Sequence, residues 1–316
     1  MRIPSIYVLA VCAAMLFGAC KDRKQNNGGE PLNDNSTTLF DTEAAVKADN
    51  GKQSAKPVEG QNGKKNAVEA DRGRAMELPA KMKDVQELLL KREGYYVSYN
   101  KERRVPNWVA WRLTAEHTNG NYYRSGEVFI EDTDVPRPRA ADSDYYGSGY
   151  DRGHLCPSGD NKWSKKAQTQ SFLFTNVCPQ NHDLNKGDWN DLEIQCRYWA
   201  KRWGELFIVT GPIFYDGVRR TIGRNKVAVP DAFFKVLLYD RSKAKAIGFV
   251  YPNKSGHKDM NEYLKPVDEI ERLTGIDFFP LLDDNVENAV EASSYRKMMD
   301  DWQVEKAVSY YNSRSK

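Results

Sequence analysis

The sequence has little cysteine, and this limits what can hold its fold together. Only five cysteines occur in 316 residues, and two of them, Cys12 and Cys20, lie near the N-terminus. The other three are Cys156, Cys178 and Cys196. They allow at most one internal disulfide and leave at least one free thiol. The sequence does not indicate which pair would be joined.

Long apolar runs and a strong charge bias are also missing. The apolar run at residues 6–17 is too short to span a membrane comfortably. The net charge is only +3, a weak argument for an anionic partner. Residues 20–80 hold ten basic and ten acidic side chains, so the surplus lies in the remainder of the chain. That surplus fits a nucleic-acid surface and fits a solvated basic face equally well.

Residues 1–19 predict a targeting signal. Arg2 precedes the apolar run, which ends in the segment 16–20, Leu-Phe-Gly-Ala-Cys. This resembles a bacterial lipoprotein signal in which Cys20 becomes the lipidated first residue, although Phe17 stands where leucine is usual. Ordinary signal-peptidase cleavage is the alternative. Both imply export, either to the cell envelope as a membrane-anchored lipoprotein on the periplasmic or extracellular face, or as a secreted protein.

The rest of the chain divides by composition. Residues 20–82 are rich in Asn, Gly, Lys, Asp and Ser and predict a disordered polar tether. Residues 83–303 predict one folded domain, followed by a C-terminal tail at 304–316. We see no internal repeat.

Within the domain, strands outnumber helices and do not alternate strictly with them. A short helix is expected at 85–92 and a loop at 143–149, and strands are expected at 108–113, 127–130, 171–176, 206–210, 233–239 and 246–251. This pattern predicts an α+β fold around a largely antiparallel sheet.

A long helix carries a carboxylate on its apolar side. Trp189, Cys196 and Trp203 recur at helical spacing, and Glu193 shares their face. A buried carboxylate must be paired or associated with a metal, because a bare buried charge is very costly. A salt bridge to Arg197 or to Arg152 is the alternative to a metal.

The segment 151–154, Asp-Arg-Gly-His, carries the residue types that phosphoryl transfer needs. His154 could act as a base for water, and Arg152 lies on the same side of a strand. Asn185 offers a carbonyl oxygen to Mg²⁺, although an asparagine there could simply cap the following helix. Asn176 could likewise be a turn-former.

A zinc site can be drawn from the same region. His154, Cys156, Cys178 and His182 could form a Cys₂His₂ set. The His-x-Cys spacing is unusual for zinc, and exported thiols tend to oxidise.

Three motifs in order resemble the DNA/RNA non-specific endonuclease family, the ββα-metal (His-Me finger) nucleases that include endonuclease G. They are DRGH at 151–154, Thr-Asn-x-x-Pro-Gln at 175–180 and Asn-x-Gly-x-Trp-x-x-Leu-Glu at 185–193. The likeness extends over roughly residues 91–282 and omits the tether. One departure is Cys156, where alanine is frequent in the family.

The resemblance implies a role for each matching residue. His154 would be the general base and Asn185 the direct ligand of Mg²⁺, with Mn²⁺ or another divalent cation as the alternative. Glu193 would hold metal-bound water. Arg152 would contact phosphate and Asn176 would line the site, with Arg124 as a candidate for a further arginine.

The implied activity is metal-dependent hydrolysis of DNA and RNA that leaves 5′-phosphate ends, with little sequence specificity. One alternative is a non-catalytic, lipid-anchored protein that binds nucleic acid on the same scaffold. The other is a phosphodiesterase that acts on a lipid or cell-wall substrate.

Overall fold

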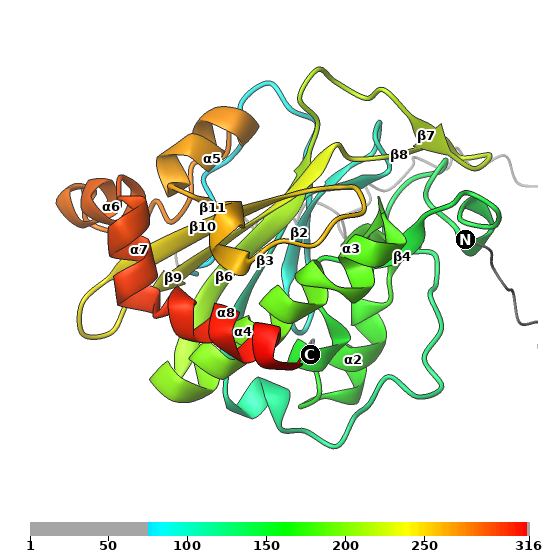
Figure 1. Ribbon diagram of the computed structural model, residues 1–316. Coiled ribbons are helices and arrows are strands. Elements are labelled where there is room, and N and C mark those ends of the chain that lie inside the picture. Colours follow the sequence, from blue (N-terminus) through cyan, green and yellow to red (C-terminus); the bar gives the residue numbers. More distant parts are fainter. Residues whose placement is uncertain (1–74, 315–316) are drawn as a thin grey trace, which may run out of the picture. The chain divides into compact units, whose positions relative to one another are not determined.

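A seven-stranded sheet forms the centre of this computed structural model, which describes residues 75–314 (Figure 1). Every pair of neighbouring strands in it is antiparallel. In spatial order the strands are β1 (Leu88–Lys91), β2 (Tyr96–Asn100), β3 (Val105–Thr114), β6 (Glu205–Ile213), β9 (Ala232–Tyr239), β10 (Lys245–Pro252) and β11 (Leu264–Lys265). The expected signal at 1–19, Cys20 and the tether as far as residue 74 lie outside the described residues.

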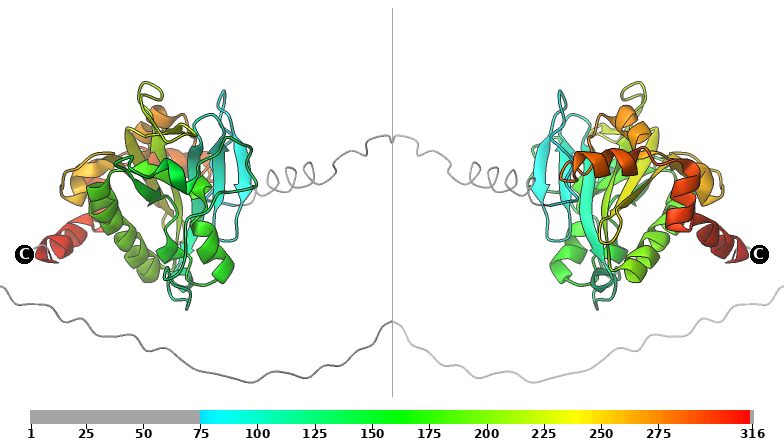
Figure 2. Two further views of the ribbon diagram at one scale, coloured as in Figure 1. Left: turned by 90° about the vertical axis from the view of Figure 1, so that its right-hand side faces the viewer. Right: turned by 90° about the vertical axis from the view of Figure 1, so that its left-hand side faces the viewer.

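The two faces of the sheet are covered by different helices. Side chains of β9 alternate between the faces, so Phe233 joins one core cluster while Phe234 joins the other. The first cluster packs against α4 (Asp188–Trp203), and the second packs against α5 (Val267–Thr274) and α6 (Asp284–Glu291). The result is a layered α+β fold, which Figure 2 shows with the sheet between its helices.

Smaller elements surround the central sheet. Two further two-stranded sheets pair β4 (Asp151–His154) with β5 (Val177–Gln180) and β7 (Thr221–Ile222) with β8 (Val227–Ala228). The remaining α-helices of the described chain are α2 (Lys165–Ser171), α3 (His182–Lys186), α7 (Tyr295–Trp302) and α8 (Val304–Arg314).

Three sequence expectations about secondary structure are wrong. Residues 85–92 include strand β1 rather than a helix, and residues 127–130 form only a single bridge, from Ile130 to Leu173. Residues 171–176 end α2 and then form a 3₁₀ turn. The last two segments resemble strands because of their aromatic side chains. These side chains pack against one another instead, with the ring centres of Phe129 and Phe172 5.2 Å apart. Tertiary packing therefore overrides local β-propensity here.

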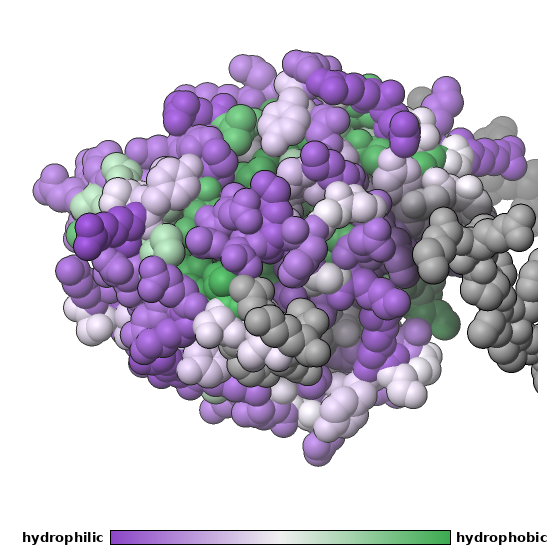
Figure 3. Space-filling view, viewed as in Figure 1, coloured by the Kyte–Doolittle hydropathy of each residue, from purple (hydrophilic) through white to green (hydrophobic). Residues whose placement is uncertain are grey.

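The folded part extends past both expected ends. Leu78, in the expected tether, is fully buried, and so is Val304, at the start of α8 in the expected tail. No helix of the described chain is long and apolar enough to cross a membrane. Hydrophilic side chains cover most of the face seen in Figure 3, and hydrophobic ones show mainly in the hollows between them.

Candidate active site

The DRGH segment is a short strand held against β5. In this ladder Asp151 is opposite Gln180 and His154 is opposite Val177. Gly153 is required by close packing, because a Cβ there would lie 2.3 Å from the Gln180 side chain. Helix α3 follows β5 directly and packs against β4, so the chain forms a ββα unit.

His154 lies at the end of β4 in an apolar pocket. Its side chain is only 9% exposed, with the rings of Phe172 and Phe129 centred 4.9 and 5.0 Å away. Burial, assisted by the charge of Arg124, lowers the imidazole pKa to about 3. The buried Nε2 makes no hydrogen bond within residues 75–314. His154 is therefore a neutral base whose Nε2 makes no hydrogen bond to the described part of the protein.

Arg124 lies beside this pocket. Its guanidinium is 5.8 Å from the centre of the Phe172 ring, and its charge acts on His154. The side chain is exposed and has no ion pair with another described residue. Arg124 can therefore place a positive charge next to the histidine without giving up a protein partner.

Arg152 is held more firmly than Arg124. Its Nε donates to the Asp142 carboxylate at 2.5 Å, and its Nη2 donates to the Asp142 carbonyl at 3.2 Å. The guanidinium also lies 5.4 Å from the centre of the Tyr145 ring. Arg152 is thus a pre-positioned cation, oriented by Asp142.

Asn176 does not line the site as expected, because it is completely buried beneath it. Its Oδ1 accepts from the Cys156 amide at 2.9 Å. Its Nδ2 donates at 2.8 Å to the carbonyls of Cys156 and Ser171. Asn176 therefore fixes the backbone two residues after His154.

Asn185 lies inside α3 and does not cap a helix; the cap of α3 is Asn181. The Asn185 Nδ2 donates to Asp151 at 2.9 Å, and His182 contacts the same carboxylate oxygen at 2.9 Å. This bond orients the amide and leaves Oδ1 without a hydrogen-bond partner in the described chain. Asp151, which orients the Asn185 amide, and His154 belong to the same short strand. The strand β4 therefore positions both the base and the free amide oxygen.

Glu193 lies on α4, half-buried, and burial raises its pKa to about 7. The positive charges of Lys235 and Arg197 oppose that shift. The alternative, a salt bridge from Glu193 to Arg197 or Arg152, is not what the described residues form, because Arg197 pairs with Asp160 at 2.9 Å and Arg152 pairs with Asp142.

Lys235 and Asp160 complete a buried group of charges that the sequence reasoning missed. Lys235 is 1% exposed, and its Nζ lies 4.4 Å from the centre of the Trp189 ring. Asp160 is 3% exposed and accepts from Trp111 Nε1 at 3.2 Å. With Glu193 and Arg197 they make two negative and two positive charges, an arrangement that lowers the cost of burial. The sequence signal that could have identified Lys235 is its position as the single charged residue in the apolar run 232–239.

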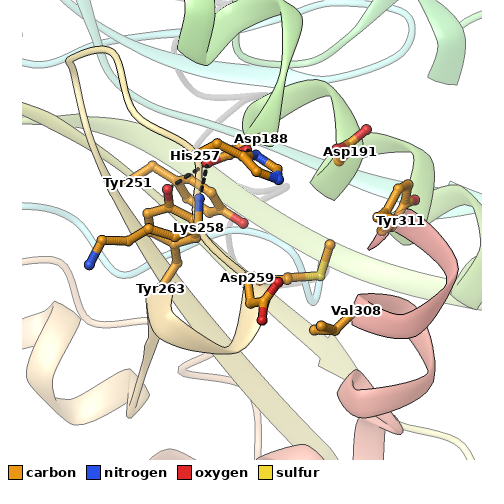
Figure 4. A pocket seen from close by; sticks show the side chains of 10 residues that line it. Asp188, Asp191, Tyr251, His257, Lys258, Asp259, Tyr263, Val308 and Tyr311 are labelled. Atoms are coloured by element: carbon orange, nitrogen blue, oxygen red, sulfur yellow. Dashed lines mark hydrogen bonds and ion pairs between the residues drawn. The ribbon is translucent and has the colours of Figure 1, made fainter. Parts of the chain in front are cut away.

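The start of α4 is fixed by its first residue. Figure 4 shows three groups converging on the Asp188 carboxylate, which accepts from the His257 ring, from Tyr263 Oη at 2.5 Å and from the Lys258 amide at 3.3 Å. These bonds anchor the helix N-terminus to the segment after β10. They therefore help to set where Glu193, little more than one turn later, meets the sheet.

The zinc alternative is excluded by geometry. His182 points to Asp151 and is largely exposed, whereas Cys156 and Cys178 are buried. No His/Cys group among residues 75–314 converges as metal ligands would. Cys156, Cys178 and Cys196 are all free thiols.

The residues present fit a hard divalent cation. Asn185 offers an unengaged amide oxygen, and Glu193 offers a carboxylate whose charged form burial disfavours, so that a bound cation would stabilise it. Oxygen donors in small number suit Mg²⁺, which keeps several of its waters.

Comparisons with known proteins place the chain in a family. A family model described as DNA/RNA non-specific endonuclease matches residues 74–285. Mouse mitochondrial nuclease EXOG is 36% identical over 207 residues, which cover 60% of this chain and 56% of that protein. Human mitochondrial endonuclease G is 35% identical over 206 residues, covering 61% and 69%. A nuclease of Nostoc is 34% identical over 227 residues, covering 68% and 81%.

A solved structure has the same fold. A chain from the crystal structure of the EndoG/EndoGI complex superposes with a TM-score of 0.61 at 29% identity, covering 66% of this chain and 91% of that one. This chain spans only 56–60% of the length of the EXOG relatives that it matches.

Proposed function

The chain belongs to the DNA/RNA non-specific endonuclease family, and on that basis we propose that it is a metal-dependent endonuclease that hydrolyses phosphodiester bonds in DNA and RNA. The observation that carries the proposal is the state of His154. It is neutral, buried and free of hydrogen bonds at Nε2, the charge of Arg124 acts on it, and Arg152 lies two residues earlier on the same strand.

In the proposed reaction the chain's own residues move a proton and bind charge. His154 accepts the proton of a water that attacks the phosphorus atom, and the 3′ oxygen leaves opposite to it, so the products carry 5′-phosphate ends. Arg124 and Arg152 stabilise the negative charge that develops on the phosphate. Because these groups address only the backbone of the substrate, little base specificity is expected.

Asn185 would bind the cation directly and Glu193 would hold one of its waters, with Mg²⁺ as the proposed ion and Mn²⁺ as the alternative. A bound divalent cation would supply Lewis-acid stabilisation at the phosphate. Asp151 would keep the Asn185 amide turned so that its oxygen faces the cation.

We also propose that the protein is exported and anchored in the cell envelope through a lipid on Cys20. The support is the charged, apolar and small-residue order of segment 1–20. The anchor would hold a nuclease domain near incoming nucleic acid at the membrane surface.

The proposed function is tested by cleavage of supercoiled plasmid and of a structured RNA by the full chain. We expect both to be degraded with Mg²⁺ and to remain intact with EDTA. Intact substrates under both conditions, with plasmid retained by the protein in a gel-shift assay, would instead establish the non-catalytic binding protein.

A positioning residue gives a finer test. We expect Asp151→Ala to raise the Mg²⁺ concentration needed for half-maximal cleavage by about 10–100-fold, the usual cost of losing the group that orients a ligand. Rates measured across a Mg²⁺ titration check this. Asp183→Ala, on the exposed side of α3, is the matched control and should follow the wild-type titration.

A further inference from the structure

Three carboxylates converge at the far side of the molecule from the candidate active site. Asp268 and Glu271 lie on α5, three residues apart and so on one face, and Glu291 is the last residue of α6. One oxygen from each lies within 4.8 Å of the others. Figure 1 shows α5 and α6 on one side of the sheet and α3 and β4 on the other.

Glu291 is the distinctive member of this acidic cluster. It is 6% exposed, and its buried Oε1 has no hydrogen-bond partner within the described chain. Buried polar atoms in proteins are nearly always satisfied, by protein, by water or by an ion. An unpartnered carboxylate oxygen aimed at two other carboxylates therefore points to a missing positive ligand.

The largest electrostatic influences on Glu291 come from other carboxylates. The charges acting on Glu291 are those of Glu271, Glu287, Asp268 and Asp277, all negative. Together with burial they raise the Glu291 pKa to about 9. The charge of Lys83 acts on Asp277, at the edge of this acidic group. Either protons or a cation must neutralise the cluster.

Helix geometry favours a cation. Glu291 lies at the C-terminal end of α6, where the helix dipole adds negative potential and unpaired carbonyls are common. That end disfavours a carboxylate and favours a positive ion. Two oxygens bound to one Ca²⁺ ion can be at most about 4.6–5.2 Å apart, so three oxygens that lie within 4.8 Å of one another are close enough to share an ion.

We propose that Asp268, Glu271 and Glu291 form a structural calcium site that joins α5 to α6. Glu271 can serve the ion with one oxygen while the other accepts the Phe278 amide at 2.8 Å. The ion would thereby tie both helices to the segment between them, which carries the fully buried Phe278 and Phe279. The site is separate from the catalytic cation and does not depend on nuclease activity.

Thermal unfolding tests the proposal. The full chain carrying Asn185→Ala, which weakens any catalytic site, is stripped with EGTA and heated with and without millimolar CaCl₂. We expect Ca²⁺ to raise Tm by on the order of 5 °C. Adding Glu291→Gln, which keeps the shape and removes the ligand charge, should cut that shift to below about 1 °C.

The control is Asp300→Asn, an exposed carboxylate on α7, which should keep the full shift. Should Glu291→Gln fail to fold, Asp268→Asn takes its place with the same expected loss. The proposal would be overturned if Ca²⁺ left the Tm of the parent chain unchanged and Glu291→Gln made the chain equally or more stable at neutral pH. That result would indicate a protonated cluster. An unchanged Ca²⁺ shift in Glu291→Gln would overturn it too.

Discussion

His154→Ala should lower the rate of plasmid cleavage by at least about 10²-fold, the scale on which a general base contributes. The reason is chemical, because alanine has no proton acceptor. The substitution also removes the ring contacts with Phe129 and Phe172, so the fold has to be checked alongside the rate. Single-turnover rates at saturating Mg²⁺, with unfolding curves to confirm a native fold, provide the measurement. His117→Ala, at a half-buried histidine stacked on Trp163 outside the candidate site, is the control and should stay close to wild type.

The pH profile adds a second readout to this experiment. The lowered pKa, about 3, keeps His154 neutral and competent at every pH above that value. An acid limb near pH 7 would therefore belong to another group. Glu193, whose pKa is about 7, loses its negative charge as pH falls through that value. His154→Ala should thus lower the rate without removing the limb; a limb that disappears would contradict this assignment.

Asn176→Ala should be among the most destabilising single changes in the domain. It leaves the amide and carbonyl of Cys156 and the carbonyl of Ser171 without their buried partner. At about 1–3 kcal/mol for each unsatisfied group, the loss should be about 3 kcal/mol or more. For a domain of this size Tm should fall by roughly 10 °C.

Thermal and urea unfolding check this, with Asn288→Ala as the control. That asparagine is exposed and makes one side-chain bond, to the Asp284 carbonyl, so its loss should shift Tm by no more than about 2 °C. An Asn176→Ala protein as stable as the control would show that the polar network is not needed to hold the loop.

Local patterns predicted the parts of the fold that depend on periodicity. The apolar runs at β6, β9 and β10 are strands, and the three- and four-residue spacing after Gly187 is helix α4. The predictions for the short segments were wrong because their hydrophobic side chains pack against other aromatic rings, and their backbones do not pair as strands. Phe174, for example, lies in a 3₁₀ turn with its ring 5.4 Å from that of Tyr145.

The site shows the same division. His154, Asn185 and Glu193 could be named because they carry reactive groups within motifs. Their supports could not, because each comes from a remote part of the chain. Asp160 meets Arg197 across 37 residues and Trp111 across 49. Lys235 acts on Glu193 from another strand. Sequence shows which side chains can react, and the tertiary fold decides what surrounds them.

Because its three cysteines are buried, we expect the domain to resist thiol oxidation and disulfide exchange. Burial raises the thiol pKa of Cys156 and Cys178 well above the usual value and that of Cys196 to about 12. The thiolate, which is the form that oxidises and exchanges, is therefore almost absent at neutral pH. A domain of this kind needs neither a disulfide-forming catalyst to mature nor a reducing compartment to survive.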